Sequence, residues 1–307
     1  MTDFAFTRKQ FLLLAFLTLA WGLNWPVMKV GVTGFPPLLF RTLSMWLGLP
    51  VLATVLAIQR TPFRIARSDR RELVVLAVTN MIVWHVLAIL AVQALSSGRA
   101  AILGYTMPIF SALWGVAMFG ERLRPRHVAG VVAAGAGVAL LLWHEIASIA
   151  GRPLAATGML VAAALWGLGT QQMRRTSIAA PTLAIVFWMT ALTTVVMSLA
   201  TFVFERDRWQ LPTAPTAMAI VYNAVLIFGL AQPIWLILAR NLPPIASSMS
   251  VMLIPVLGTV SRAWWLGESL HWQDGAAIAL VLVAIASVMW PTRSRRAPAE
   301  AAEVGNL

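Results

Sequence analysis

The chain has 307 residues, 60% of them hydrophobic, and only 11% are charged, which is less than half the charged share of soluble domains. The formal net charge of +12 at pH 7 could indicate a nucleic-acid partner, but the basic residues lie between apolar segments and form no patch with aromatic residues. Because the chain has no cysteine, a disulfide framework and a thiolate metal site are excluded. The composition therefore excludes a soluble domain and nucleic-acid binding, and it favours a protein embedded in a lipid bilayer.

Splitting the sequence at every charged residue leaves ten uncharged windows of at least 18 residues. They are, in chain order, 10–28, 42–59, 73–98, 100–120, 127–144, 153–173, 176–204, 209–239, 241–261 and 275–292. Each window is long enough for a helix that crosses the ~30 Å hydrocarbon core. The first window contains Trp21, Asn24 and Pro26 and lacks a small-residue cleavage site, so we expect a retained helix and not a signal peptide. The sequence thus predicts an all-α integral membrane protein with ten transmembrane helices and short loops.

The basic residues set the expected orientation. If ten helices alternate from a cytoplasmic N-terminus, 16 of the 23 Lys and Arg residues fall in inside segments, five of them between residues 60 and 71. Four lie in outside loops, and three (Lys29, Arg41 and Arg262) lie near helix ends. The positive-inside rule then predicts a multi-pass protein of the cell (inner) membrane with both termini in the cytoplasm.

The two halves of the chain resemble each other. At an offset of 145, Leu165-Trp166-Gly167-Leu168 repeats Ala20-Trp21-Gly22-Leu23, and at an offset of 147, Pro108, Gly120 and Glu121 recur as Pro255, Gly267 and Glu268. We therefore expect one repeat at 11–149 with helices 1–5, a second at 150–291 with helices 6–10, and a disordered cytoplasmic tail at 292–307. Because five is an odd number, the two copies must be inverted in the membrane. Chance similarity between apolar helices is the alternative, and the constant Pro, Gly and Glu offset argues against it.

Inverted repeats with short loops are typical of secondary transporters, in which one half rocks against the other around a site at the midplane. The spans contain no His-Glu-x-x-His, no paired aspartates and no Gly-x-Ser-x-Gly, so we do not expect an enzyme, and a membrane-embedded enzyme is a remote alternative. A P-loop is also missing, and we expect neither a cofactor nor a metal. Since one chain supplies both halves, the transporter can be complete as a monomer.

Three stretches carry a resemblance to a known family. They are Trp21-Gly-Leu-Asn24-Trp-Pro26-Val-Met-Lys29, the run Ser97-Gly-Arg-Ala-Ala-Ile-Leu-Gly-Tyr-Thr-Met-Pro108, and Gly120-Glu121-Arg-Leu, with their echoes in the second half. In these the chain resembles the drug/metabolite transporter superfamily and, within it, the ten-helix proteins of the EamA family. The likeness extends from about residue 11 to residue 291.

The resemblance implies a central cavity lined by helices 1, 3, 4, 6, 8 and 9, and export of amino acids, related metabolites or drugs. Amino acid exporters of the YddG type, which the chain resembles, have an aromatic cavity with a histidine on helix 3 and a tyrosine on helix 4. Several other aromatic residues of those exporters have no counterpart here, because this chain has only two tyrosines. The residues that we expect to line the cavity are Trp21, Asn24, Trp84, His85, Tyr105, Trp166 and Gln232.

Each of these residues also has a structural interpretation. The chain has 14 tryptophans, and many must be packing residues or interfacial anchors, as we expect for Trp143, Trp209, Trp272 and Trp290. His85 can be a neutral imidazole bonded to a neighbouring helix. Trp21 and Trp166 differ from the anchors because both lie mid-span before a glycine, at equivalent positions of the two repeats.

Prolines and basic residues complete the expected site. Pro108, Pro233 and Pro255 predict helix kinks, which free backbone carbonyls for a cavity or let the halves rock. Lys29 follows Trp25 by one turn and is a candidate outer gate for carboxylates, whereas we expect Arg41 and Arg262 to snorkel to the interface. Glu121 and Glu268 are expected to pair with arginines and not to contact the solute.

The carboxylates bear on the kind of solute. All eleven Asp and Glu residues lie in loops, tails or at helix ends, so none is expected at the bilayer centre. A buried cationic drug needs a counter-charge, because contacts with tryptophan faces compensate its desolvation only in part. We therefore expect small neutral or zwitterionic solutes such as neutral amino acids, moved without a membrane carboxylate as proton carrier. A multidrug or organic-cation exporter is the alternative, with His85 as the proton carrier.

The predicted orientation can be tested directly, because the chain has no native cysteine. A single cysteine at Gln273 should react with an impermeant maleimide added to intact cells, whereas one at Ser68 should react only after the membrane is opened. Labelling of Ser68 alone in intact cells would reverse the orientation, and labelling of neither position would contradict the number of spans.

Overall fold

The computed structural model describes residues 8–121, 151–235 and 271–289, with single positions in 125–140 and 254–267. The described residues form helices and no strand. The first part of the chain contains α1 (Arg8–Val32), α2 (Pro37–Ile58), η1 (Arg67–Asp69), α3 (Arg70–Ala77), η2 (Val78–Ile82), α4 (Val83–Ala94), α5 (Ser97–Gly104) and α6 (Met107–Phe119). The second part contains α8 (Pro153–Arg174), α9 (Thr182–Glu205), η3 (Arg206–Arg208), α10 (Ala214–Tyr222), η4 (Asn223–Ala231) and α13 (Trp272–Met289). The segments η2 and η4 are π-helical, and η1 and η3 are short 3-10 turns.

Seven helices among the described residues are long and apolar enough to cross a membrane. They are Leu12–Val32, Pro37–Ile58, Arg67–Ala94, Ser97–Phe119, Pro153–Arg174, Thr182–Arg208 and Ala214–Trp235. Two shorter apolar helices, Val128–Gly137 and Trp272–Ala284, overlap two further windows, 127–144 and 275–292. The all-α prediction is confirmed. The count of ten in two repeats stays a prediction, because most of window 241–261, with Pro255, and the whole tail 292–307 lie outside the described residues.

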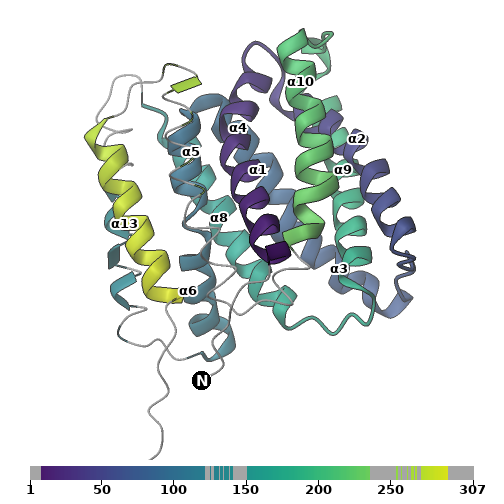
Figure 1. The fold of residues 1–307 in the computed structure, drawn as a ribbon, viewed down its shortest axis with the longest axis horizontal. Helices are drawn as coiled ribbons and strands as arrows, with labels where there is room; N and C mark the ends of the chain where they lie inside the picture. The colour runs from purple at the N-terminus through teal and green to yellow at the C-terminus, as the bar shows by residue number, and fades with distance from the viewer. Residues whose placement is uncertain are drawn as a thin grey trace, which may run out of the picture.

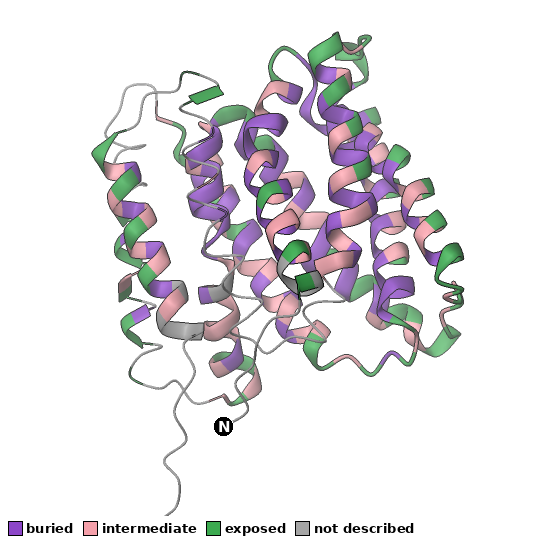
Figure 2. Ribbon diagram, in the orientation of Figure 1, coloured by how far each residue is buried: buried purple, intermediate pink, exposed green. Residues whose placement is uncertain are grey.

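The helices of the two predicted halves interlock (Figure 1). Helix α8 of the second half packs against α4, α5 and α6 of the first, while α2 of the first half packs against η4 and α9 of the second. Helix α13 lies at one side of the bundle, next to α6 (Figure 1). Buried residues gather on the faces turned toward the bundle interior, and exposed residues lie on its outside (Figure 2). The outer faces carry large apolar side chains such as Leu19, Leu47 and Leu199, as expected of a surface that meets lipid.

Local chemistry fixes where α2 begins. Pro36 and Pro37 supply the φ angle of a helix start and have no backbone N–H to satisfy. The free N–H groups of Leu38 and Leu39 donate to the buried carboxylate of Glu205, at N–O distances of 3.1 and 2.8 Å. Since Glu205 is the last residue of α9, this cap also joins the two halves at one end of the bundle.

The repeated Gly-Glu signature has a backbone explanation. Gly120 follows the last residue of α6 with a φ of 67°, and its counterpart Gly267 has a φ of 63°. This left-handed conformation closes the end of a helix and strains any residue with a Cβ atom. At Gly120 the signature therefore marks the end of α6, in line with the position expected for Glu121.

The glycines of the two Trp-Gly pairs have corresponding neighbours. A Cβ atom added to Gly167 would lie 2.6 Å from the backbone nitrogen of Ser111 and 2.9 Å from the carbonyl oxygen of Met107. One added to Gly22 would lie 2.8 Å from Cβ of Leu257. These neighbours lie next to Pro108 and Pro255 in the sequence, so each of the two glycines packs close to the proline segment of the other predicted half. This reciprocity is what an internal two-fold repeat requires.

The close approach of α6 and α8 predicts different effects for two glycines of α8. Gly167→Ala forces a Cβ atom onto backbone atoms and should destabilise the fold by about 1–3 kcal/mol, the usual cost of overpacking. Gly158→Ala is the matched control, because no atom lies within 4 Å of its added Cβ. The melting temperatures of the purified variants in detergent measure the difference. Equal values would mean that α6 and α8 lie farther apart than described.

Candidate functional site

Four aromatic side chains from both halves meet in what we call the aromatic cluster: Trp25, Trp84, Tyr105 and Trp166. The rings of Trp84 and Trp166 lie edge to face with centroids 5.0 Å apart, and those of Trp25 and Tyr105 lie 6.1 Å apart. The two pairs meet at Gly104, where an added Cβ would lie 3.2 Å from both Trp25 and Trp84. The structure thus brings together three of the seven predicted cavity residues and adds Trp25.

A break between α5 and α6 positions this cluster. Helix α5 ends at Gly104, and α6 begins at Met107, directly before Pro108. Thr106 bridges the break, since its hydroxyl donates to the carbonyl of Leu103 at 2.6 Å. Pro108 therefore stands at a helix start and does not kink a continuous helix. The break leaves Tyr105 buried between the two helices.

Trp21 and Gln232 have partners other than the four rings of the aromatic cluster. The ring of Trp21 packs edge to face on Trp235 at 5.5 Å. The amide nitrogen of Gln232 lies 3.6 Å from the sulfur of Met81. Pro233 follows the π-helical η4, whose wider turns accommodate the missing proline N–H. These residues occupy the contact of α1 and η2 with the end of the η4 helix.

His85 belongs to a different cluster from its neighbour Trp84, since consecutive helical residues point about 100° apart. Its ring packs on Phe228 of η4 at 5.3 Å. Neither of its ring nitrogens has a hydrogen-bond partner among the described residues, and the same holds for Oδ1 of Asn24. No helix of the described part of the chain supplies the hydrogen bond that the structural alternative, a neutral histidine bonded to a neighbouring helix, would require.

Arg41 corrects a prediction. We expected it to snorkel to the interface, but its side chain is only 3% exposed. Its guanidinium donates to Oδ1 of Asn223 at 3.1 Å and to the sulfur of Met28 at 2.7 Å. The prediction was wrong because α2 begins at Pro37, which places Arg41 inside the helix on the face toward η4. The proline pair at 36–37 was the sequence signal for that earlier start.

Lys29 has a structural partner. Its ammonium donates to the carbonyls of Val92, Gln93 and Leu95, at 3.0, 2.9 and 2.8 Å, and so closes the C-terminal end of α4. A cation is favourable there because the free carbonyls carry partial negative charge. A gating role for Lys29 stays a prediction, and it would require these bonds to break. Arg262 and Glu268 lie outside the described residues.

Polar contacts also join the halves at the opposite end, which the sequence predicts to face the cytoplasm. Arg175 pairs with Glu121 and packs over the ring of Phe119 at 4.3 Å, as expected for an arginine partner of that glutamate. The carboxylate of Glu72 accepts hydrogen bonds from the hydroxyls of Thr176 and Ser177, at 2.6 and 2.7 Å. Together with the Glu205 cap, these contacts hold the halves at both ends.

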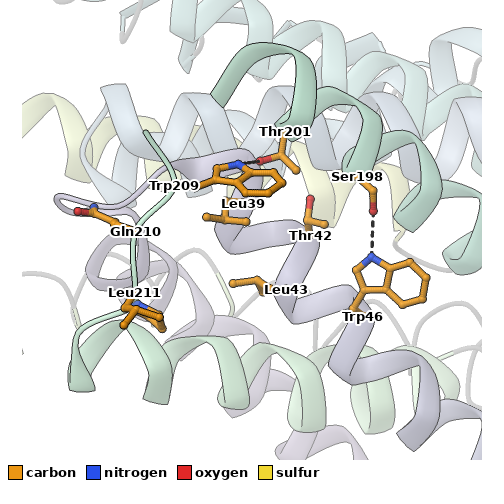
Figure 3. A pocket seen from close by; sticks show the side chains of 10 residues that line it. Leu39, Thr42, Leu43, Trp46, Ser198, Thr201, Trp209, Gln210 and Leu211 are labelled. Atoms are coloured by element: carbon orange, nitrogen blue, oxygen red, sulfur yellow. Dashed lines mark hydrogen bonds between the residues drawn. The ribbon is translucent and has the colours of Figure 1, made fainter. Parts of the chain in front are cut away.

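A surface groove runs between α2, α9 and the segment 209–212 (Figure 3). It is lined by Leu39, Thr42, Leu43, Trp46, Ser198, Thr201, Trp209, Gln210, Leu211 and Pro212. The indole N–H of Trp46 donates to Ser198 at 2.9 Å, and that of Trp209 to Thr201 at 3.3 Å (Figure 3). Half-exposed tryptophans of this kind are typical of a membrane interface, the role expected for Trp209. None of the seven predicted cavity residues lines this groove.

The fold and these clusters are typical of multi-pass membrane transporters. The EamA-like transporter family matches residues 8–143 and again residues 153–290, so the chain belongs to this family. It is 25% identical to the "Uncharacterized inner membrane transporter YedA" of Escherichia coli (strain K12), over 92% of either chain. It is 26% identical to a "Probable amino-acid metabolite efflux pump" of Salmonella typhimurium, over 94% of this chain and 98% of that one. A solved crystal structure shares the fold, with a TM-score of 0.68 at 20% identity, covering 93% of this chain and 99% of that one.

The aromatic cluster predicts a separable effect for Trp166. Its side chain is only partly buried, so Trp166→Ala should lower the stability modestly while reducing transport at least about tenfold, because it removes one wall of the cluster. Uptake of labelled L-leucine into proteoliposomes and melting in detergent measure the two effects. Trp272→Ala, at a side chain 71% exposed, is the control and should leave both unchanged. A loss of uptake that merely follows a loss of folding would assign Trp166 to the packing core.

Proposed function

We propose that this chain exports small metabolites, foremost neutral and aromatic amino acids, by alternating access of two inverted repeats around a central aromatic cavity. The observation that carries the proposal is the aromatic cluster, to which α1, α4 and the α5–α6 break contribute from one half and α8 from the other. An interface between moving halves is where a transporter binds its solute. Aromatic faces there suit an apolar side chain and, through the π-system, an ammonium group.

The relatives support the same class of solute. The Salmonella protein that is similar over nearly its whole length bears the name of an amino-acid metabolite efflux pump, and we extend that class to this chain. The proposal includes the repeat boundaries 11–149 and 150–291, a monomer, and a position in the inner membrane with both termini in the cytoplasm. The seven predicted cavity residues, the Lys29 gate and the kinks at Pro233 and Pro255 belong to it as well.

Alternating access requires contacts between the halves that can break at one end while they hold at the other. Polar contacts of this kind exist at both ends: Arg175 with Glu121 at one, and Glu205 with the start of α2 at the other. The reciprocal packing of Gly22 and Gly167 supports a two-fold relation between the halves. Rocking about those close contacts would expose the cluster to either side in turn.

The position of the carboxylates favours amino acids over the alternative, a multidrug or organic-cation exporter. Within the described ranges, Asp69, Glu72, Glu121, Glu205, Asp207 and Asp274 all lie in loops, in 3-10 turns or within three residues of a helix end. A permanent cation bound mid-membrane would therefore meet no described counter-charge, and its desolvation would go largely uncompensated.

Transport by the purified full-length chain in proteoliposomes tests the proposal. Labelled L-leucine, L-phenylalanine and L-tryptophan should equilibrate down their own gradients with no imposed pH difference, because no membrane carboxylate is needed as proton carrier. Labelled tetraphenylphosphonium, a lipophilic cation, should not be transported. Uptake confined to the cation, or strictly dependent on a proton gradient, would overturn the proposal in favour of the multidrug alternative.

A further inference from the structure

Arg41 is a permanent charge placed well inside the bundle. It lies four residues after Pro37, about 6 Å along the axis of α2 from its start, and its side chain is 3% exposed. Its partners among the described residues are the amide oxygen of Asn223, the sulfur of Met28 and the ring of Phe228, whose centroid lies 5.6 Å from Cζ. Its Nε–H has no partner among the described residues.

No carboxylate of the described residues lies within 4.0 Å of this guanidinium. The buried carboxylate of Glu205 accepts from the N–H groups of Leu38 and Leu39, which precede Arg41 on α2, and it pairs with Arg208. The charge of a buried cation held only by an amide, a thioether and an aromatic face stays largely uncompensated. Such a group needs an anion that the described part of the chain does not supply.

Two further side chains leave polar atoms unsatisfied beside Arg41. His85 and Arg41 contact the same Phe228 ring, and both ring nitrogens of His85 lack partners. Asn24 lies one turn of α1 before Met28, the sulfur ligand of Arg41, and its Oδ1 is also unpaired. His85 is 5% exposed and Asn24 is 8% exposed. Three side chains, each at least nine-tenths buried, therefore keep hydrogen-bonding capacity for something other than the described chain.

We propose that Arg41, with His85 and Asn24, forms the subsite that binds the carboxylate of the transported solute. The free guanidinium N–H and one imidazole N–H donate to the carboxylate, and the guanidinium supplies the counter-charge. The Oδ1 atom of Asn24 accepts from the solute's ammonium group. Asn223 and Met28 orient the guanidinium through its remaining N–H groups.

This inference rests on the proposed function and makes it more specific. Met28 and Phe228, which contact Arg41, belong to the same buried apolar core as Trp25 and Tyr105, so the subsite adjoins the aromatic cluster through that core. One amino acid could then place its carboxylate at Arg41 and its apolar side chain at the aromatic rings. An organic cation without a carboxylate would be repelled by Arg41.

Competition experiments in proteoliposomes test the subsite. Unlabelled L-leucine and L-leucinamide, which lacks the carboxylate, each compete with labelled L-leucine for transport, and the ratio of their inhibitory concentrations gives the preference. The measurement is made on the wild type and on the variants Arg41→Gln, Arg41→Lys and Arg206→Gln. The wild type should prefer leucine to leucinamide at least about tenfold, in the range of a charge-assisted hydrogen-bonded contact. Arg41→Gln should lose this preference, and Arg41→Lys should retain part of it, because lysine keeps the charge without the fork of donors. Arg206→Gln, the same change at a side chain 62% exposed, should behave as the wild type.

The outcomes separate the two proposals. Leucine transport with the same preference in the wild type and in Arg41→Gln would overturn the subsite and leave the proposed function standing. Equal potency of leucine and leucinamide in the wild type would overturn the subsite even if Arg41→Gln fails to fold.

If the wild type transports no amino acid, the proposed function fails, and the carboxylate subsite is then tested by ligand binding. Binding is measured as a change in melting temperature. Indole-3-acetate and benzoate should raise the melting temperature of the wild type and of Arg206→Gln in detergent, whereas indole-3-acetamide and benzamide should not. Arg41→Gln should show no such difference between acids and amides. Equal effects of acids and amides on the wild type would overturn the subsite independently of transport.

Discussion

The hydrocarbon core of a bilayer offers no water to unpaired backbone groups, so every departure from a regular helix must be satisfied by the protein itself. In this chain the departures coincide with the candidate site. The π-helical segment η2 precedes His85, η4 carries Asn223 and Phe228, and the break between α5 and α6 carries Tyr105. Irregular turns are costly in this environment, and they rotate polar and aromatic side chains into the bundle interior where a straight helix would not.

The sequence predicted the helical class and most of the spans, because a long uncharged window has few alternatives in a membrane. It could not place Arg41. The predicted spans were delimited by charged residues, so every charged residue was assigned to the boundary of a span. A charged residue that lies inside a helix is therefore wrongly predicted to lie at the helix end. The structure begins α2 at Pro37, where the proline pair and the Glu205 cap fix the start, and Arg41 then lies within the span.

The sequence predicted several residues of the candidate site, but it did not predict which of them contact one another. The structure does bring together Trp84, Tyr105 and Trp166. Gly104 has no side chain, so the indoles of Trp25 and Trp84 can approach the break between α5 and α6. Adjacency in sequence was misleading for Trp84 and His85, since neighbours on a helix face different partners. Asn223 gave no signal beyond being a polar residue in an apolar window. Its role depends on Arg41, which reaches it from 182 positions away in the sequence.

The charge balance of the interior connects these features to selectivity. Each described carboxylate that is buried has partners at a helix end: Glu205 caps α2, and Asp274 at the start of α13 lies 3.7 Å from Arg99. Arg41 is buried with partners that carry no negative charge. The interior described here is therefore positive around Asn24 and His85 and aromatic around Trp166. A solute that brings a carboxylate and an apolar group satisfies both regions at once, whereas a cation satisfies only the aromatic one. Selection for amino acids against organic cations would then follow from a single uncompensated arginine, with no acidic residue needed in the membrane.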